Sequence, residues 1–188
     1  MTYIEQIKNY QPFNEQEEYD KNLILDFINK NPNNLYRENL AAHITSSAIV
    51  VNETMTKVLF AYHNIYDSWS WVGGHNDGDS NLLKVAIKET KEETGIKEVK
   101  PYSKDIFMLD VIYVENHIKN EKYVPDHLHL NLTFLLIADE NQKLVIKPDE
   151  NQAVQWIELD KVFDMISEPR MVPVYKKAFT KLKKLNNY

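Results

Sequence analysis

The stretch from Gly74 to Ile96, GHNDGDSNLLKVAIKETKEETGI, determines how this chain is interpreted. It begins as a glycine-containing loop, continues from Asn81 to Thr94 with apolar residues at helical spacing, and stops at a glycine. The four glycines of the chain all lie in or directly before this stretch: Gly73, Gly74, Gly78 and Gly95. Glycine permits sharp turns and close backbone approaches, and it is favoured just after the end of a helix. The stretch therefore predicts a loop, a helix and a second loop in close succession.

Three glutamates of the predicted helix lie on the same side of it. Glu89, Glu92 and Glu93 are spaced at i, i+3 and i+4, and like charges at this spacing repel by about a few tenths of a kcal/mol per exposed pair. A bound divalent cation would remove this repulsion, and ligands that are all oxygen favour Mg²⁺ or Mn²⁺. The alternative is a solvated acidic face that is balanced by neighbouring lysines. The glycine loops on both sides of the helix favour the metal site.

Taken together, these residues resemble the Nudix box, G-x5-E-x7-R-E-U-x-E-E-x-G-U, in which U is a bulky apolar residue. The matching positions are Gly74, Glu89, Glu92, Glu93, Gly95 and Ile96. Three positions depart from the pattern, because Ser80 replaces the first glutamate, Lys88 replaces the arginine and Thr90 replaces an apolar residue. The strand pattern around the box fits the same family over about residues 43–160.

The resemblance implies an α/β fold, a Nudix-type α/β/α sandwich with a mixed sheet, and hydrolysis of a nucleoside diphosphate linked to another moiety. By position, Glu89, Glu92 and Glu93 would be catalytic and would hold Mg²⁺ or Mn²⁺, with the Gly74 carbonyl as a further ligand. One of these glutamates, or another nearby carboxylate, would act as the base. Such enzymes often take another acidic ligand from a loop before a late strand. Glu150 is our candidate for it and Asp149 the second choice, the alternative being a turn carboxylate in water.

The departures from the box bear on activity rather than on fold. Ser80 cannot supply a charge, although Asp79 would replace the missing glutamate if the loop were one residue tighter. Lys88 keeps the positive charge but lacks the two-pronged geometry of arginine. A second hypothesis is therefore a catalytically degenerate Nudix module that binds a nucleotide as a sensor. The isopentenyl-diphosphate isomerase branch of the superfamily is disfavoured, because it uses a catalytic cysteine and this chain has none.

Histidines supply the candidate substrate contacts. His127 and His129 alternate with leucines, so one face of their predicted strand is polar. That face would line the substrate cleft, or it would simply face solvent. His75 follows a double glycine and would contact phosphate, unless it is an ordinary loop histidine. We therefore expect His75, His127 and His129 to bind the substrate.

Composition limits the classes of partner and location. The net charge of −6 would repel a phosphate backbone, so nucleic acid is not expected as a partner unless metal ions mediate the contact. A small nucleoside diphosphate derivative is the expected partner, and a homodimer is expected by family resemblance. The longest apolar stretches, such as residues 48–51 and 134–138, fall far short of the ~20 residues that span a membrane. With no signal-peptide pattern at the start, we expect a cytoplasmic protein.

Hydrophobic periodicity predicts one mixed α/β domain over residues 1–188, with a helical N-terminal extension over residues 1–42. Within the helix of the box, we expect one arc to face the core, formed by Leu83, Ala86, Ile87, Thr90 and Thr94. Strands are predicted over residues 43–52, 57–63, 105–114, 127–138 and 153–159. Helices are predicted over residues 81–94, 161–166 and 172–185.

Overall fold

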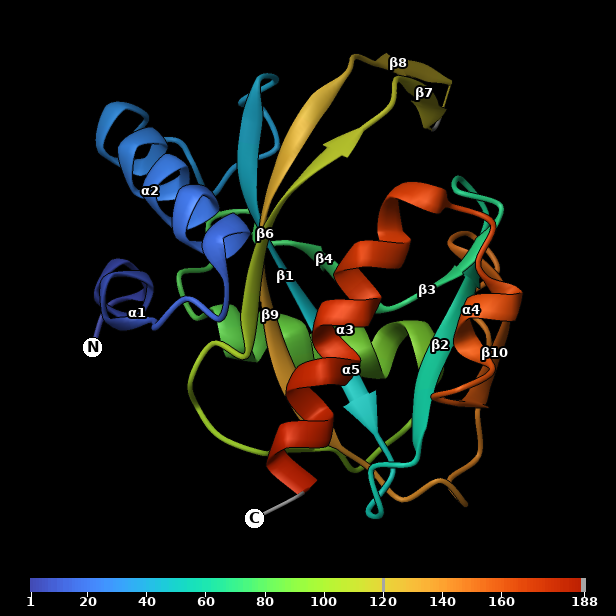
Figure 1. The fold of residues 1–188 in the computed structure, drawn as a ribbon. Helices are drawn as coiled ribbons and strands as arrows, with labels where there is room; N and C mark the ends of the chain where they lie inside the picture. The colour runs from blue at the N-terminus through green and yellow to red at the C-terminus, as the bar shows by residue number, and fades with distance from the viewer. Residues whose placement is uncertain (120, 187–188) are drawn as a thin grey trace. The chain divides into compact units, whose positions relative to one another are not determined.

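The computed structural model describes residues 1–119 and 121–186, and Figure 1 shows its elements. The chain divides into two compact units. Unit 1 comprises Met1–Ser47, Gly73–Ala86 and Lys104–Phe134, and unit 2 comprises Ala48–Val72, Ile87–Ser103 and Leu135–Tyr188. Three elements begin in unit 1 and end in unit 2: strand β1 (Ala42–Val51), helix α3 (Leu82–Thr94) and strand β9 (His127–Ile137). A single domain over residues 1–188 stays a prediction.

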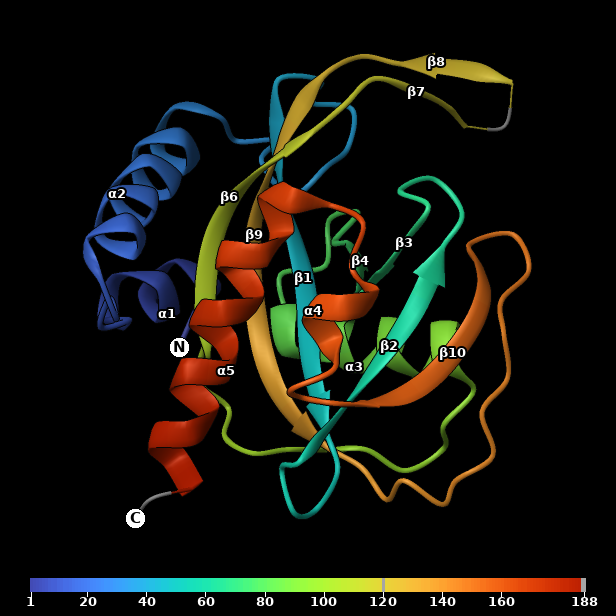
Figure 2. The ribbon, with the colours of Figure 1, turned by 45° about the vertical axis from the view of Figure 1, so that its right-hand side comes forward.

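The extension predicted as helical over residues 1–42 contains two helices, which end at Lys30, and residues 31–41 form turns and bends. Helix α1 (Tyr3–Asn9) begins with a capping box formed by Thr2 and Glu5, and Asn14 caps helix α2 (Glu15–Lys30). Helix α2 packs against strand β6 (Met108–Val114), beside which it lies in Figures 1 and 2. Asp20 on α2 joins the two elements, because its Oδ2 accepts a hydrogen bond of 2.9 Å from the N–H of Val111. This helical layer buries apolar side chains such as Ile24.

Strands of unit 1 enclose a buried polar seam. β6 pairs antiparallel with β9, and β7 (His117–Lys119) and β8 (Lys122–Val124) form a hairpin. Asn131 Oδ1 accepts hydrogen bonds from Thr45 at 2.9 Å and Ser47 at 2.7 Å, and its amide donates to Thr133 at 2.9 Å. All four side chains are buried. The polar face of strand β9 is therefore buried at His127, Asn131 and Thr133, where the solvent-facing alternative is wrong, while His129 is half-buried.

Strand β4 (Val72–His75) pairs with β1, and a glycine allows its close approach. A Cβ atom added at Gly73 would lie 2.6 Å from Ser47 Cα and 2.7 Å from the Ser46 carbonyl oxygen. Real Cβ atoms do not come so near to backbone atoms, so any larger residue would displace β4 from Ser47.

In unit 2, strand β2 (Lys57–His63) pairs antiparallel with β10 (Asn151–Glu158), with β3 (Ser68–Ser70) and with the end of β1. Strand β5 (Lys100–Pro101) pairs with the end of β9. Helix α5 (Val172–Asn186) packs on β2, where the rings of Tyr175 and Phe60 lie 5.0 Å apart. The remaining helical turns are α4 (Val162–Met165) and η1 (Pro169–Met171).

The expected helices and strands agree with the structure in type, but several bounds differ, and the short strands β3, β4, β5, β7 and β8 lie outside the predicted ones. Strand β6 begins at Met108 rather than at residue 105. In helix α3, the predicted core positions Ala86, Thr90 and Thr94 are buried. Leu82 and Val85 are buried in place of Leu83 and Ile87, which are only half-buried. Consecutive leucines start this helix, and packing rather than periodicity decides which of them faces the core.

No helix within residues 1–119 and 121–186 is long and apolar enough to cross a membrane.

Candidate active site

The second half of helix α3 belongs to unit 2 and carries the three glutamates of the box. It ends at Gly95, whose φ of +74° is favourable only for glycine among common residues. The next segment of the site packs directly on this end, because the N–H of Val145 donates to the Thr94 carbonyl at 2.9 Å. A Cβ atom at Gly95 would lie 2.6 Å from the Cβ atom of Val145. Gly95 therefore ends the helix and, because it has no side chain, leaves room for Val145.

Asn151 fixes the turn of residues 147–151 to the same helix end. Its side chain is 1% exposed. The Nδ2 group donates to the Glu93 carbonyl at 3.0 Å, and Oδ1 accepts from the N–H of Lys147 at 3.2 Å. The residue that follows β2 also holds the turn, since the N–H of Asn64 donates to the Glu150 carbonyl at 2.9 Å. These bonds bring the Glu150 side chain to the glutamates of α3.

Glu89, Glu93 and Glu150 form a convergent set of carboxylates. One oxygen of each lies within 4.8 Å of the others. Glu93 is buried at 3% exposure, whereas the side chains of Glu89 and Glu150 are 12% and 27% exposed. Three carboxylates that converge from two segments provide the donor set that Mg²⁺ or Mn²⁺ prefers. The residues present therefore fit a hard divalent cation.

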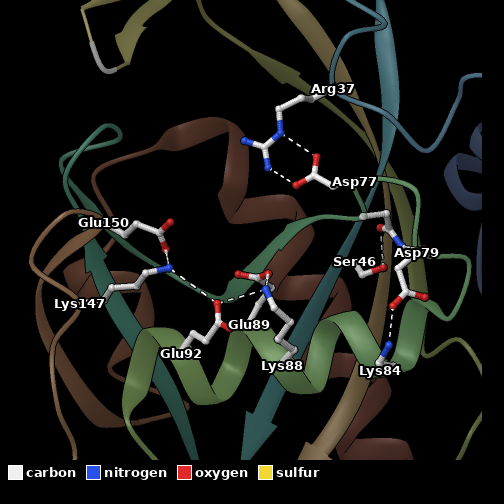
Figure 3. A network of polar contacts seen from close by, with 11 residues as sticks. Arg37, Ser46, Asp77, Asp79, Lys84, Lys88, Glu89, Glu92, Lys147 and Glu150 are labelled. Carbon is white, nitrogen blue, oxygen red and sulfur yellow. Dashed lines mark hydrogen bonds and ion pairs between the residues drawn. The ribbon is translucent and has the colours of Figure 1, made fainter.

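Two lysines neutralise part of this negative charge (Figure 3). Lys88 Nζ lies 2.8 Å from Glu89 Oε1 and 3.2 Å from Glu92 Oε2. Lys147 Nζ lies 3.1 Å from Glu150 Oε2 and 3.8 Å from Glu92 Oε2. The hydrogen bond to Glu89 raises the pKa of Lys88. Burial opposes the charged form of Lys147, but the hydrogen bond and the negative charges around it outweigh burial and raise its pKa.

The structure brings some of the predicted metal ligands together and leaves others apart. The structure brings Glu150 to Glu89 and Glu93, and it leaves Asp149 exposed in the turn. Glu92 lies beside this trio with a side chain that is 43% exposed. Gly74 lies on β4 in unit 1, and its role as a ligand stays a prediction.

At the start of α3, in unit 1, Ser80 is exposed and Asp79 has local partners. Asp79 Oδ2 accepts from Lys84 Nζ at 2.8 Å (Figure 3). Its Oδ1 accepts from the N–H of Asn81 at 2.9 Å. These bonds lower the pKa of Asp79. Both oxygens of Asp79 are thus engaged at the first turn of the helix, where they stabilise it, and neither bond supports Asp79 as a substitute for the missing glutamate.

Sequence reasoning missed Lys147, Asn151 and Glu168. Lys147 lies three residues before Glu150, a spacing that could have indicated their ion pair. The bond between Asn151 and Glu93 joins residues 58 positions apart and leaves no local signal in the sequence.

Glu168 is a partly enclosed carboxyl group, and burial raises its pKa. Burial also raises the pKa of nearby Tyr66 to about 12, to which the charge of Glu168 adds.

In unit 1 the three predicted histidines gather with a fourth, His43. The ring centroid of His43 lies 5.0 Å from that of His75 and 5.1 Å from those of His127 and His129. Burial lowers the pKa of His43, and it lowers the pKa of His129 well below the usual range, with further lowering by the other histidines. The substrate-binding role of His75, His127 and His129 stays a prediction.

A family comparison covers most of the chain. The model of the NUDIX domain matches residues 42–182. The chain belongs to the NUDIX domain family. The expectations of a Nudix protein and of a hydrolase are thereby confirmed at the level of the family.

Individual relatives are distant. The mRNA-decapping enzyme subunit 2 of Saccharomyces cerevisiae (strain YJM789) is 25% identical over 118 residues, which cover 61% of this chain and 11% of that protein. This NUDIX chain therefore matches only a small part of that relative's length. A C. elegans Ap4A hydrolase in a binary complex is 17% identical with a TM-score of 0.54, covering 74% of this chain and 98% of that one. A NUDIX-family hydrolase from Clostridium perfringens is 16% identical with a TM-score of 0.55, and the match covers 74% of this chain and 97% of that one. These structures confirm the expected α/β Nudix fold.

Proposed function

We propose that this NUDIX protein is a divalent-metal-dependent hydrolase that cleaves the diphosphate linkage of a nucleoside diphosphate joined to another moiety. The observation that carries the proposal is the convergence of Glu89, Glu93 and Glu150 within 4.8 Å. Family membership supports the reaction class, and the fold of an Ap4A hydrolase supports a nucleotide substrate.

Glu89, Glu93 and Glu150 would hold the cation, either Mg²⁺ or Mn²⁺. When bound, the ion supplies positive charge that offsets the phosphate oxygens and makes a water more acidic. The burial of Glu93 and the bonds of the 147–151 turn keep these carboxylates in place before the cation arrives. Such preorganisation lowers the cost of assembling the site.

Glu92 is the carboxylate best placed to act as the base. It is the most exposed of the four, at 43%, and its Oε2 lies 3.2 Å from Lys88 Nζ and 3.8 Å from Lys147 Nζ. Its Oε2 would take a proton from water, whose oxygen attacks phosphorus while the bond to the leaving phosphate breaks. The same two lysines, at the edge of the carboxylates, would attract the phosphate groups of the substrate.

A small nucleotide derivative fits an acidic chain better than a long nucleic acid. The net charge of −6 opposes any polyanion that cations do not shield. The distant decapping relative nevertheless makes capped RNA a compound to test. A homodimer stays a prediction.

A nucleotide sensor without turnover is the second candidate. It is favoured by Ser80, which is exposed at the position where the Nudix box has its first glutamate. A hydroxyl group cannot replace the charge of a carboxylate beside a cation.

Product release from a panel of diphosphate-linked nucleotides and a capped RNA, with Mg²⁺ or Mn²⁺, tests the proposal. Glu93→Gln keeps the shape of the side chain and removes its charge, so turnover should fall by at least about 100-fold. Glu98→Gln is the matched control, because Glu98 is exposed outside the cluster. Absence of turnover by the wild type, with a nucleotide still raising its melting temperature, would support the sensor. Full turnover by Glu93→Gln would refute the assigned site.

A further inference from the structure

Four of the chain's six histidines meet in unit 1. His43 lies on β1, His75 on β4, and His127 and His129 on β9. Besides the distances from His43, the rings of His75 and His129 are 5.1 Å apart, and those of His127 and His129 are 5.0 Å apart. Three strands distant in sequence thus place imidazoles around one point.

His43 has a buried nitrogen that lacks a hydrogen-bond partner. The residue is 3% exposed, and its Nδ1 lies 3.1 Å from the Asn39 carbonyl oxygen. Because a carbonyl oxygen only accepts, Nδ1 carries the hydrogen and Nε2 carries a lone pair. Among the described residues, none hydrogen-bonds to this Nε2. An unsatisfied buried polar atom costs about 1–3 kcal/mol, so an additional group at Nε2 would stabilise the cluster.

His127 orients His129 in a similar way. His127 Nδ1 lies 2.8 Å from the Pro125 carbonyl oxygen and therefore carries the hydrogen. Its Nε2 lies 3.2 Å from Nε2 of His129, so His129 donates this bond and keeps its lone pair on Nδ1. Histidines that bind metals usually donate their other ring N–H to an oriented acceptor, which fixes the ring and its tautomer. Both His43 and His129 have such an acceptor.

We propose that His43, His75 and His129 form a binding site for a zinc-class divalent cation. One ligand nitrogen of each lies within 4.8 Å of the other two. Tetrahedral zinc, with Zn–N bonds of about 2.0–2.1 Å, spaces its ligand nitrogens about 3.3 Å apart. The three imidazoles would therefore have to bring their ligand nitrogens together to that spacing when the cation binds. An all-imidazole site selects Zn²⁺, Co²⁺, Ni²⁺ or Cu²⁺ over Mg²⁺ and Mn²⁺.

This site differs in chemistry from the carboxylate cluster and goes beyond the proposed hydrolysis. Its three ligands are uncharged, so the cation keeps its charge and a fourth position stays open for water or an anion. Arg37 and Asp77, whose charges act on His43, form an ion pair with each other (Figure 3). Their charges largely cancel, so they would not repel the cation. A bound cation would crosslink β1, β4 and β9 within unit 1.

Zinc titration of the full chain tests this proposal. Protein stripped by a chelator is titrated calorimetrically with Zn²⁺ in excess Mg²⁺, which occupies the carboxylates. Co²⁺ absorption then reports the coordination geometry. His75→Gln and His129→Gln remove one ligand each from half-buried positions, and His117→Gln is the control, because His117 lies outside the trio with its ring 6.4 Å from that of His127. Thermal melting without zinc checks that each variant is folded.

We expect one equivalent of Zn²⁺ to bind the wild type and the control, with at least about tenfold weaker binding in each ligand variant. The wild type with bound Co²⁺ should show the absorption spectrum of tetrahedral coordination. Zn²⁺ should raise the melting temperature of the wild type. Glu93→Gln should bind zinc normally, which separates this proposal from the proposed hydrolysis. Absence of saturable zinc binding by the wild type, or equal binding by the folded ligand variants, would overturn the proposal.

Discussion

Replacing Asn151 by alanine tests whether one buried amide holds the 147–151 turn on helix α3. The substitution removes the bond of 3.0 Å to the Glu93 carbonyl and the bond of 3.2 Å from the N–H of Lys147. Leaving a buried polar group without its partner costs about 1–3 kcal/mol. With two such groups affected, we expect the free energy of unfolding to fall by about 2–4 kcal/mol. For a chain of this length, that lowers the melting temperature by about 5–15 °C.

Function should change together with stability, because Asn151 keeps Glu150 beside Glu89 and Glu93. We expect Asn151→Ala to bind Mn²⁺ at least about tenfold more weakly at a temperature where it is folded. Urea unfolding followed by circular dichroism gives the stability, and calorimetric titration gives the affinity. Asn141→Ala is the control, since Asn141 is exposed and its amide bonds to Asp139 in its own turn. A stability loss below about 0.5 kcal/mol in Asn151→Ala would refute the reasoning.

Three further substitutions test other parts of unit 2. Gly95→Ala forces a positive φ on alanine and a clash with Val145. Urea unfolding should therefore show a free energy of unfolding that is lower by about 2–4 kcal/mol. A variant as stable as the wild type would contradict this. Lys147→Met removes an ammonium group that competes with cations, so Mn²⁺ titration should show about 3–10-fold tighter binding, whereas exposed Lys91→Met should leave it unchanged. Burial raises the pKa of the Glu168 carboxyl group, so the folded state binds the carboxyl proton more tightly than the unfolded state does. The stabilisation that this proton provides is lost as the pH rises through the raised pKa. Glu168→Gln should therefore raise the melting temperature near about pH 8 but not near about pH 4, and an equal change at both would oppose this assignment.

Local patterns in the sequence predicted most of the elements. Strand β2 has the bounds read from its β-branched and apolar run, and helix α3 starts one residue after the predicted Asn81. The spacing of the box glutamates and the family resemblance also led to Glu150, which the structure places beside Glu89 and Glu93. These features depend on periodicity and on short motifs, both of which a single sequence carries.

Tertiary packing determines what the sequence could not show. His43 stands at the start of a strand without any neighbouring signal, and it joins the other histidines only because β1, β4 and β9 come together in unit 1. Likewise, Asn131 reaches Thr45 across 86 positions of sequence. Alternation showed that one face of β9 is polar, but burial of that face depends on strands elsewhere in the chain.

The two lysines among the carboxylates give this protein a chemical reporter of its own. Acylating reagents attack only the neutral amine, so the raised pKa values of Lys88 and Lys147 should make both slow to label at neutral pH. Exposed Lys91, on the same helix, provides an internal reference for labelling rate. A cation that engages the carboxylates would weaken both ion pairs, and labelling of Lys88 and Lys147 should then accelerate relative to Lys91. Mass spectrometry of labelled peptides would thus measure occupancy of the carboxylate site before any substrate is known.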